Sequence, residues 1–140
     1  MAADGLMTQA GVIVHQANSK IERLPDGRIF GSGGDAAGGQ MIRDWLADYK
    51  REGGKRRPFP SIEEETAALV LNLDGTVDLY EHSGQGQPIR VQVPMAIGSG
   101  MSIAIGAMDA GASPQRAVEI AALRIATVGG KIDILELSRP

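Results

Sequence analysis

Two predicted β-hairpins constrain the fold of this 140-residue chain more than any other feature of its sequence. Asp74-Gly75 interrupts an otherwise strand-like segment, 67–81, and this dipeptide favours a two-residue turn because both positions tolerate positive φ. Residues 20–30 predict another hairpin around the Pro-Asp-Gly turn at 25–27, where proline presets φ and glycine supplies a positive φ. The chain is therefore expected to contain an antiparallel sheet.

The remaining segments add shorter strands and three helices. Short apolar or alternating runs predict strands at 12–14, 89–93 and 132–137. Apolar periodicity and small residues predict helices at 35–51 and 101–110, and a third helix that begins after Ser113 and stops at the glycines 129–130.

Two of these helices have specific signals. The helix at 35–51 has an apolar face at spacing i, i+3, i+4, i+7, formed by Ile42, Trp45, Leu46 and Tyr49. The third helix has Ser113 as N-cap and Pro114 at its first position. Its apolar face is formed by Val118, Ala121, Ala122 and Ile125.

The order of the segments is strands, helix, strands, two consecutive helices and a final strand. Antiparallel hairpins with segregated helices favour a layered α+β domain over an alternating βαβ sheet. The length predicts a single domain, residues 1–140, that can bury a core without disulfides.

Composition argues against several classes of function. A net charge of −3 gives no long-range attraction for nucleic acid, and the basic cluster at 55–57 is too short to indicate such a surface. The absence of cysteine excludes disulfides and thiolate metal sites and fits a reducing cytoplasm. No apolar stretch reaches the length of a membrane span, and no secretion signal is visible. We therefore expect a cytoplasmic protein without nucleic-acid or membrane contacts, metal or cofactor.

Glycine-rich segments at 31–34 and 98–100 precede predicted helices, where backbone amides can bind an anion. Neither has the lysine of a phosphate loop, and the hairpins argue against a dinucleotide-binding unit. Tight turns into the helices are the alternative. His15 and His82 have no matched carboxylate or third ligand, so surface or turn positions are expected. The acidic run 63–65 is expected to be solvated, and no GxSxG serine motif is present.

Asp4 and Lys20 form the pair with the most chemical interest. A lysine can help to activate an N-terminal hydroxyl nucleophile when a carboxylate holds its ammonium group in place. From the residues alone, a solvated surface lysine is the alternative.

Taken together, these segments resemble the proteasome β-subunit and bacterial HslV family over essentially the whole chain. Residues 3–8 resemble the family's A-G-D-x-x-x-T stretch, and residues 20–24 resemble the segment that carries its active-site lysine. Asp4 and Lys20 are 16 positions apart, the separation between the catalytic aspartate and lysine of the family.

Two glycine-containing turns extend the resemblance. Residues 29–36 resemble the turn whose backbone amide forms the oxyanion hole before the first long helix. Residues 96–100, Ala-Ile-Gly-Ser-Gly, match the family's A-I-G-S-G turn, whose serine lies beside the nucleophile. The final helix pair and strand also fall where the family has them.

The resemblance implies a four-layer αββα sandwich of the N-terminal nucleophile (Ntn) hydrolase type. It also implies a threonine-type endopeptidase, in which a terminal threonine attacks a peptide carbonyl with its own α-amino group as base. Asp4 and Lys20 would then tune the nucleophile, Gly33 or its neighbours would donate to the oxyanion, and Ser99 would support the amine.

The sequence departs from the family at its nucleophile. In the family the threonine precedes the aspartate by about a strand and a turn, whereas this sequence begins at Met1, just before Asp4. Thr8 cannot substitute because it follows the aspartate and is not terminal. A later family aspartate has no clear counterpart near 125–128. We therefore expect a sandwich that lacks part of its first strand, an N-terminally truncated chain, and no peptidase activity as written.

Three interpretations remain open: a late start within a longer catalytic protein, a non-catalytic structural or assembly subunit of a ring complex, and an unrelated small α+β binding module. A missing strand would leave a sheet edge unpaired and expose a groove, which oligomer contacts would cover unless stability were lowered. The resemblance also implies a peptide or unfolded-protein substrate, a homo-oligomer as ring or dimer, and a regulatory ATPase partner.

Overall fold

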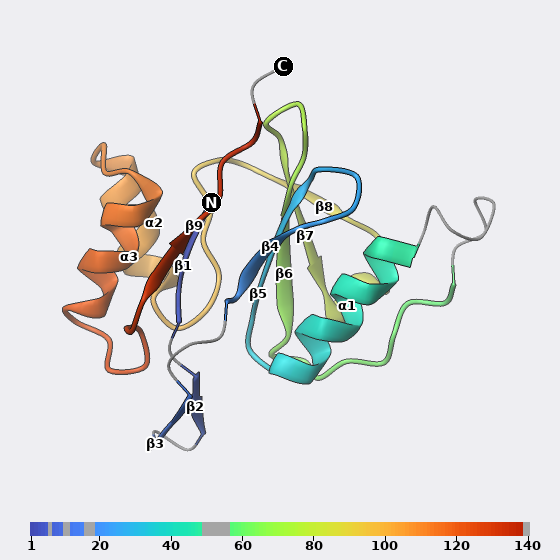
Figure 1. Cartoon of the computed structure of the whole chain (residues 1–140), viewed down its shortest axis with the longest axis horizontal. Coiled ribbons are helices and arrows are strands. Elements are labelled where there is room, and N and C mark those ends of the chain that lie inside the picture. Colours follow the sequence, from blue (N-terminus) through green and yellow to red (C-terminus); the bar gives the residue numbers. More distant parts are fainter. Residues whose placement is uncertain (6, 10–11, 16–18, 49–56, 139–140) are drawn as a thin grey trace.

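The computed structural model of the protein describes all residues except 6, 10–11, 16–18, 49–56 and 139–140 (Figure 1). Its strands are β1 (Ala2–Asp4), β2 (Met7–Gln9), β3 (Val12–His15), β4 (Ile21–Arg23), β5 (Ile29–Gly33), β6 (Ala67–Leu71), β7 (Val77–Glu81), β8 (Ile89–Val91) and β9 (Ile132–Ile134). Its helices are α1 (Ala36–Asp48), α2 (Met101–Asp109) and α3 (Pro114–Ala122), with a 3₁₀ turn, η1 (His82–Gly84).

Five strands form an antiparallel sheet in the order β4-β5-β6-β7-β8. Both predicted hairpins are confirmed, because β4 pairs with β5 and β6 with β7. The second connection is longer than the predicted two-residue turn, since the strand pairing ends at Leu71 and Val77. Gly75, in the second turn, has φ of +85°, a value that favours glycine over residues with a Cβ atom. This sheet is the central layer on which the other elements pack.

One face of the five-stranded sheet packs against α1 and forms an apolar core. Helix α1 begins where the Asp35 carboxylate accepts a hydrogen bond from Gly38 N at 2.6 Å, an N-cap interaction. The core consists of Leu24, Phe30, Ile42, Leu46, Ile62, Ala68, Val70 and Tyr80, with Trp45 and Phe59 packed against it. The predicted apolar face of the first helix is therefore confirmed at Ile42, Trp45 and Leu46, while Tyr49 lies outside the described residues.

The opposite face of this sheet looks toward a second, two-stranded sheet formed by β1 and β9. Strand β1 approaches β5 closely, because a Cβ atom at Gly31 would lie 2.9 Å from Met1 Sδ. Helices α2 and α3 pack against each other, and α3 contacts β1 and β9 from the far side. The layers are therefore α1, the five-stranded sheet, the β1–β9 sheet and the α2–α3 pair (Figure 1), which confirms the predicted αββα arrangement.

Several predicted boundaries are longer than the observed ones. The first helix was expected over 35–51 and is described over 36–48, and the strands expected at 89–93 and 132–137 end at Val91 and Ile134. The third helix begins as predicted, with Ser113 Oγ accepting from Arg116 N, but it ends at Ala122 and so excludes Ile125. The reason is that the backbone turns after Leu123 to bring residues 127–129 back to β1.

Two further predictions are corrected at strands. Gly31 and Gly33 belong to strand β5, so the turn into α1 is shorter than the predicted glycine turn at 31–34 and centres on Gly34. The strand expected at 12–14 is confirmed as β3, which pairs with β2 in a separate hairpin. No helix in the described part of the chain is both long and apolar enough to cross a membrane.

Candidate active site

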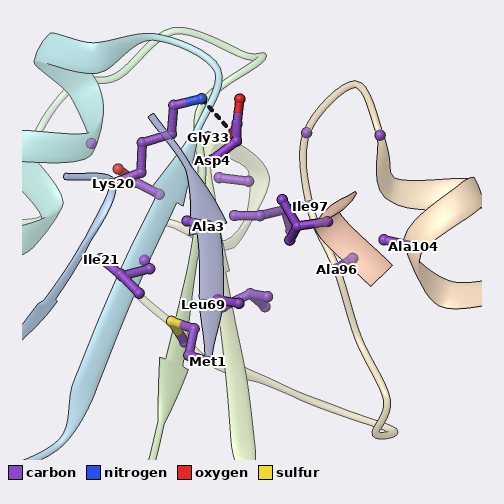
Figure 2. A pocket seen from close by; sticks show the side chains of 18 of the residues that line it. Met1, Ala3, Asp4, Lys20, Ile21, Gly33, Leu69, Ala96, Ile97 and Ala104 are labelled. Carbon is purple, nitrogen blue, oxygen red and sulfur yellow. Dashed lines mark hydrogen bonds and ion pairs between the residues drawn. The ribbon is translucent and has the colours of Figure 1, made fainter. Parts of the chain in front are cut away.

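Asp4 and Lys20 lie together, as the family resemblance implied. Asp4 ends strand β1 and Lys20 directly precedes β4, so the layering of the two sheets brings the side chains together. Lys20 Nζ donates to Asp4 Oδ1 at 2.8 Å (Figure 2). The side chains are 28% and 13% exposed, so the ion pair is partly shielded from water and is stronger than a fully exposed pair.

The second carboxylate oxygen of Asp4 binds a different part of the chain. Asp4 Oδ2 accepts a hydrogen bond from Gly129 N at 3.0 Å, and the neighbouring Gly5 N donates to Gly129 O at 3.1 Å. Both carboxylate oxygens are therefore used, one by the ammonium group and one by the loop that follows α3. Asp4 is fixed in orientation by these two contacts.

Ser99 lies on the loop before α2 and shares a hydrogen bond with Thr127, with 2.7 Å between the two hydroxyl oxygens. The loops at 98–100 and 127–129 pack closely, since a Cβ atom at Gly100 would lie 3.1 Å from Val128 Cγ2. Thr127 is thus a site residue that sequence reasoning missed. The family resemblance directed attention to an acidic residue in this region, whereas the chain supplies a hydroxyl from a residue 28 positions away from Ser99.

Gly33 lies at the end of β5 and faces the loop that carries Ser99. A Cβ atom at Gly33 would lie 3.7 Å from both Gly98 Cα and Ile97 Cδ1, so a larger residue would narrow the space between the sheet and this loop. The next residue, Gly34, has φ of +84° and passes close to the Glu65 carbonyl group. Only glycine fits this position without displacing the backbone.

All four predicted site residues, Asp4, Lys20, Gly33 and Ser99, line one cavity of about 1170 Å³ between the five-stranded sheet and the α2–α3 pair (Figure 2). Its floor includes Leu69 and Leu71 of β6, and its far side includes Ala104 of α2 and Val118 of α3. Strand β1 forms one wall, and the loop 93–100 forms another. The cavity has a polar end at Asp4 and Lys20 and largely apolar sides. An open groove therefore lies between the five-stranded sheet and the α2–α3 pair.

The α-ammonium group of Met1 lies at the opposite end of β1 from Asp4. It donates to Leu135 O at 2.7 Å, and burial, opposed by the nearby charge of Glu136, lowers its pKa from the usual 8.0. This amine is therefore held by Leu135, the residue that follows β9, and is separated from Lys20 by the length of β1.

The hydroxyl groups that line the cavity belong to Ser19, Ser32, Ser99 and Thr127. Ser19 Oγ donates to Ile21 O at 2.7 Å, and Ser99 and Thr127 bind each other, so these three already have partners. Thr8 lies in β2. The site thus combines a cation, a carboxylate, paired hydroxyl groups and glycine amides around an open space.

Of the other candidate groups, Glu63, Glu64, His82 and Arg57 are described and are not among the residues that line this cavity. Glu63, Glu64 and Glu65 are exposed, as expected, although Glu65 also borders the cavity through the turn at Gly34. His82 begins η1, and His15 lies in β3. Among the described residues, no group of three or more His, Asp or Glu side chains is arranged to hold a metal ion. Of the basic cluster, only Arg57 lies within the described residues.

Comparisons with known proteins place the fold. No protein-family model and no curated protein matches the sequence. Among solved structures, BPH of Thiobacillus denitrificans, a bacterial proteasome homologue, is similar with a TM-score of 0.69 and 18% identity over 99% of this chain and 92% of that chain. Its complex with epoxomicin is similar with a TM-score of 0.69 and 19% identity over 99% and 92% of the two chains.

A further similar structure is the eukaryotic HslV of Trypanosoma brucei, with a TM-score of 0.64 and 18% identity over 94% of this chain and 88% of that chain. At these identities the comparisons establish the fold, and the order and layering of the elements agree with it. The chain has the Ntn-hydrolase fold of the proteasome and HslV proteins.

Proposed function

We propose that the chain is a proteasome-like or HslV-like β-type subunit whose Asp4, Lys20, Gly33 and Ser99 support a threonine peptidase site. The observation that carries this proposal is the Lys20–Asp4 ion pair at the polar end of the cavity, 2.8 Å long and only partly exposed. Asp4 ends β1 of the two-stranded sheet and Lys20 precedes β4 of the five-stranded sheet, so this ion pair forms only where the two sheets pack together. Here the carboxylate is also fixed by Gly129 N, which suits a group that must hold a lysine in one position.

In the proposed chemistry, a threonine hydroxyl group at the polar end of the cavity attacks the carbonyl carbon of a peptide bond. The α-amino group of that threonine accepts the hydroxyl proton, while the Lys20 ammonium group stabilises the negative charge that develops on the attacking oxygen. Ser99, oriented by Thr127, lies on the facing loop and can hydrogen-bond the α-amino group.

A glycine amide at the end of β5 would donate to the oxyanion that forms on the substrate carbonyl group. Ser32 N donates to Lys20 O, so the amides of β5 alternate between the β4 side and the β6 side. This alternation directs Gly33 N toward β6. We therefore propose that Gly33 shapes the turn into α1 and that the backbone N–H group of the neighbouring Gly34 donates to the oxyanion.

None of the described threonine residues that line the cavity combines a hydroxyl group with a free α-amine beside Lys20. The chain with the printed sequence is therefore expected not to cleave peptides. The proposed chemistry therefore requires a threonine with a free α-amino group at the polar end of the cavity.

The second candidate function is a non-catalytic structural or assembly subunit. It is favoured by the position of the Met1 amine, which binds Leu135 O and lies away from Lys20. In that case the Asp4 and Lys20 pair serves to join the two sheets, and no added strand would restore catalysis.

The proposed partners follow from the same fold. A peptide or unfolded protein is the proposed substrate, and a homo-oligomer is the proposed assembly, with a regulatory ATPase as a further partner. Solubility in the cytoplasm is consistent with the absence of cysteine from the sequence. Several large apolar side chains are exposed in the single chain, including Leu123 at 74%, Leu73 at 65% and Val93 at 55%, which suits burial against other subunits.

The test compares the chain as printed with a variant in which a short threonine-initiated strand and an Asn-Gly turn precede Met1. Hydrolysis of small fluorogenic peptides is measured with and without epoxomicin, the ligand of the similar Thiobacillus denitrificans structure. The printed chain is expected to be inactive, and the extended chain to show cleavage that epoxomicin blocks. An inactive extended chain in which the added strand is shown by NMR to pair with β1 would favour the structural-subunit function instead.

A further inference from the structure

We draw no further inference here: the strongest candidate, the part of the cavity beside Lys20 that Glu22 of β4 and Gly39 and Gln40 of α1 line, belongs to the candidate active site already described.

Discussion

Asp4 connects three parts of the chain through its two carboxylate oxygens. It binds Lys20 at the start of β4 and Gly129 after α3, while its own backbone belongs to β1. The loop at 127–129 in turn holds Ser99 through Thr127. A continuous set of contacts therefore runs from Lys20 to Ser99 around the polar end of the cavity, and a change at Asp4 is expected to affect all of it.

At the residue scale, the Asp4–Lys20 interaction is testable by a double-mutant cycle with Asp4→Asn and Lys20→Met. We expect a coupling free energy of about 1–2 kcal/mol in urea unfolding, because the pair is partly buried and hydrogen-bonded. The control is the pair Lys131 and Asp133, in which the lysine is 82% exposed and the charged atoms are 3.6 Å apart, so that the coupling should be near zero. Equal coupling in the two cycles would contradict the special position of Asp4.

A second residue-scale prediction concerns how the free energy of unfolding changes as the pH falls. Burial alone would raise the pKa of Asp78, but hydrogen bonds from Arg90 and Asn72 outweigh it and hold the pKa below the usual 3.8. The carboxylate therefore stabilises the fold above pH 3.8, and this contribution is lost as pH falls through the lowered folded-state pKa. The free energy of unfolding should be lower in Asp78→Asn than in the wild type by about 1 kcal/mol near neutral pH. Below pH 3.8 the difference should shrink; a pH-independent difference would contradict this assignment.

The contact between Asp4 and Lys20 was expected from the family resemblance, in which an aspartate and a lysine have the same 16-residue separation, and the structure contains this contact. From the residues alone a solvated lysine was equally open. Thr127 was missed because its contact with Ser99 depends on how α3 ends and how the following loop turns back, and neither leaves a local pattern. The catalytic roles of Asp4, Lys20, Gly33 and Ser99 remain predictions.

At the scale of elements, Gly38 of α1 and Gly106 of α2 allow a matched comparison of what an added methyl group does to a helix. A Cβ atom at Gly38 of α1 would lie 2.6 Å from Thr66 Oγ1, and Thr66 is completely buried. A Cβ atom at Gly106 of α2 would meet nothing within 4 Å. Replacement by alanine should stabilise a helix by roughly 0.5–1 kcal/mol when there is space for the methyl group.

We therefore expect Gly106→Ala to raise the thermal unfolding midpoint and Gly38→Ala to lower it. The physical reason for the loss is that the buried Thr66 side chain cannot move away from the new methyl group, and α1 must shift from the sheet. Differential scanning calorimetry measures both changes. A stabilising effect at Gly38 would show that α1 does not pack on β6 as described.

Elements with local signals were predicted, and elements defined by distant contacts were not. The hairpins at 20–30 and 67–81 have turn residues that set their geometry, and both are present. Strand β1 has three residues, Ala2–Asp4, without a strand-forming pattern, and it exists through pairing with β9 at the other end of the chain. Such a pair of short strands is stabilised by the layers around it, which the sequence does not encode locally.

At the scale of the whole molecule, the four layers and the groove between them imply further association. Large apolar side chains such as Leu73, Val93 and Leu123 are exposed in the single chain. We predict that the purified chain forms a homo-oligomer in sedimentation velocity experiments, because assembly removes this apolar surface from water. Sedimentation as a single chain across all accessible concentrations would count against the proposed ring or dimer.

The central claim is that Lys20 and Asp4 support a nucleophile placed beside β1, and one matched pair of rates tests it most directly. In the chain extended by a threonine-initiated strand, peptide cleavage is compared between Lys20→Ala and Lys131→Ala, the second being a lysine that is 82% exposed. The account predicts a loss of at least about a hundredfold for Lys20→Ala, in the range of a directly participating group, and no loss for Lys131→Ala. Equal rates in the two variants would contradict it.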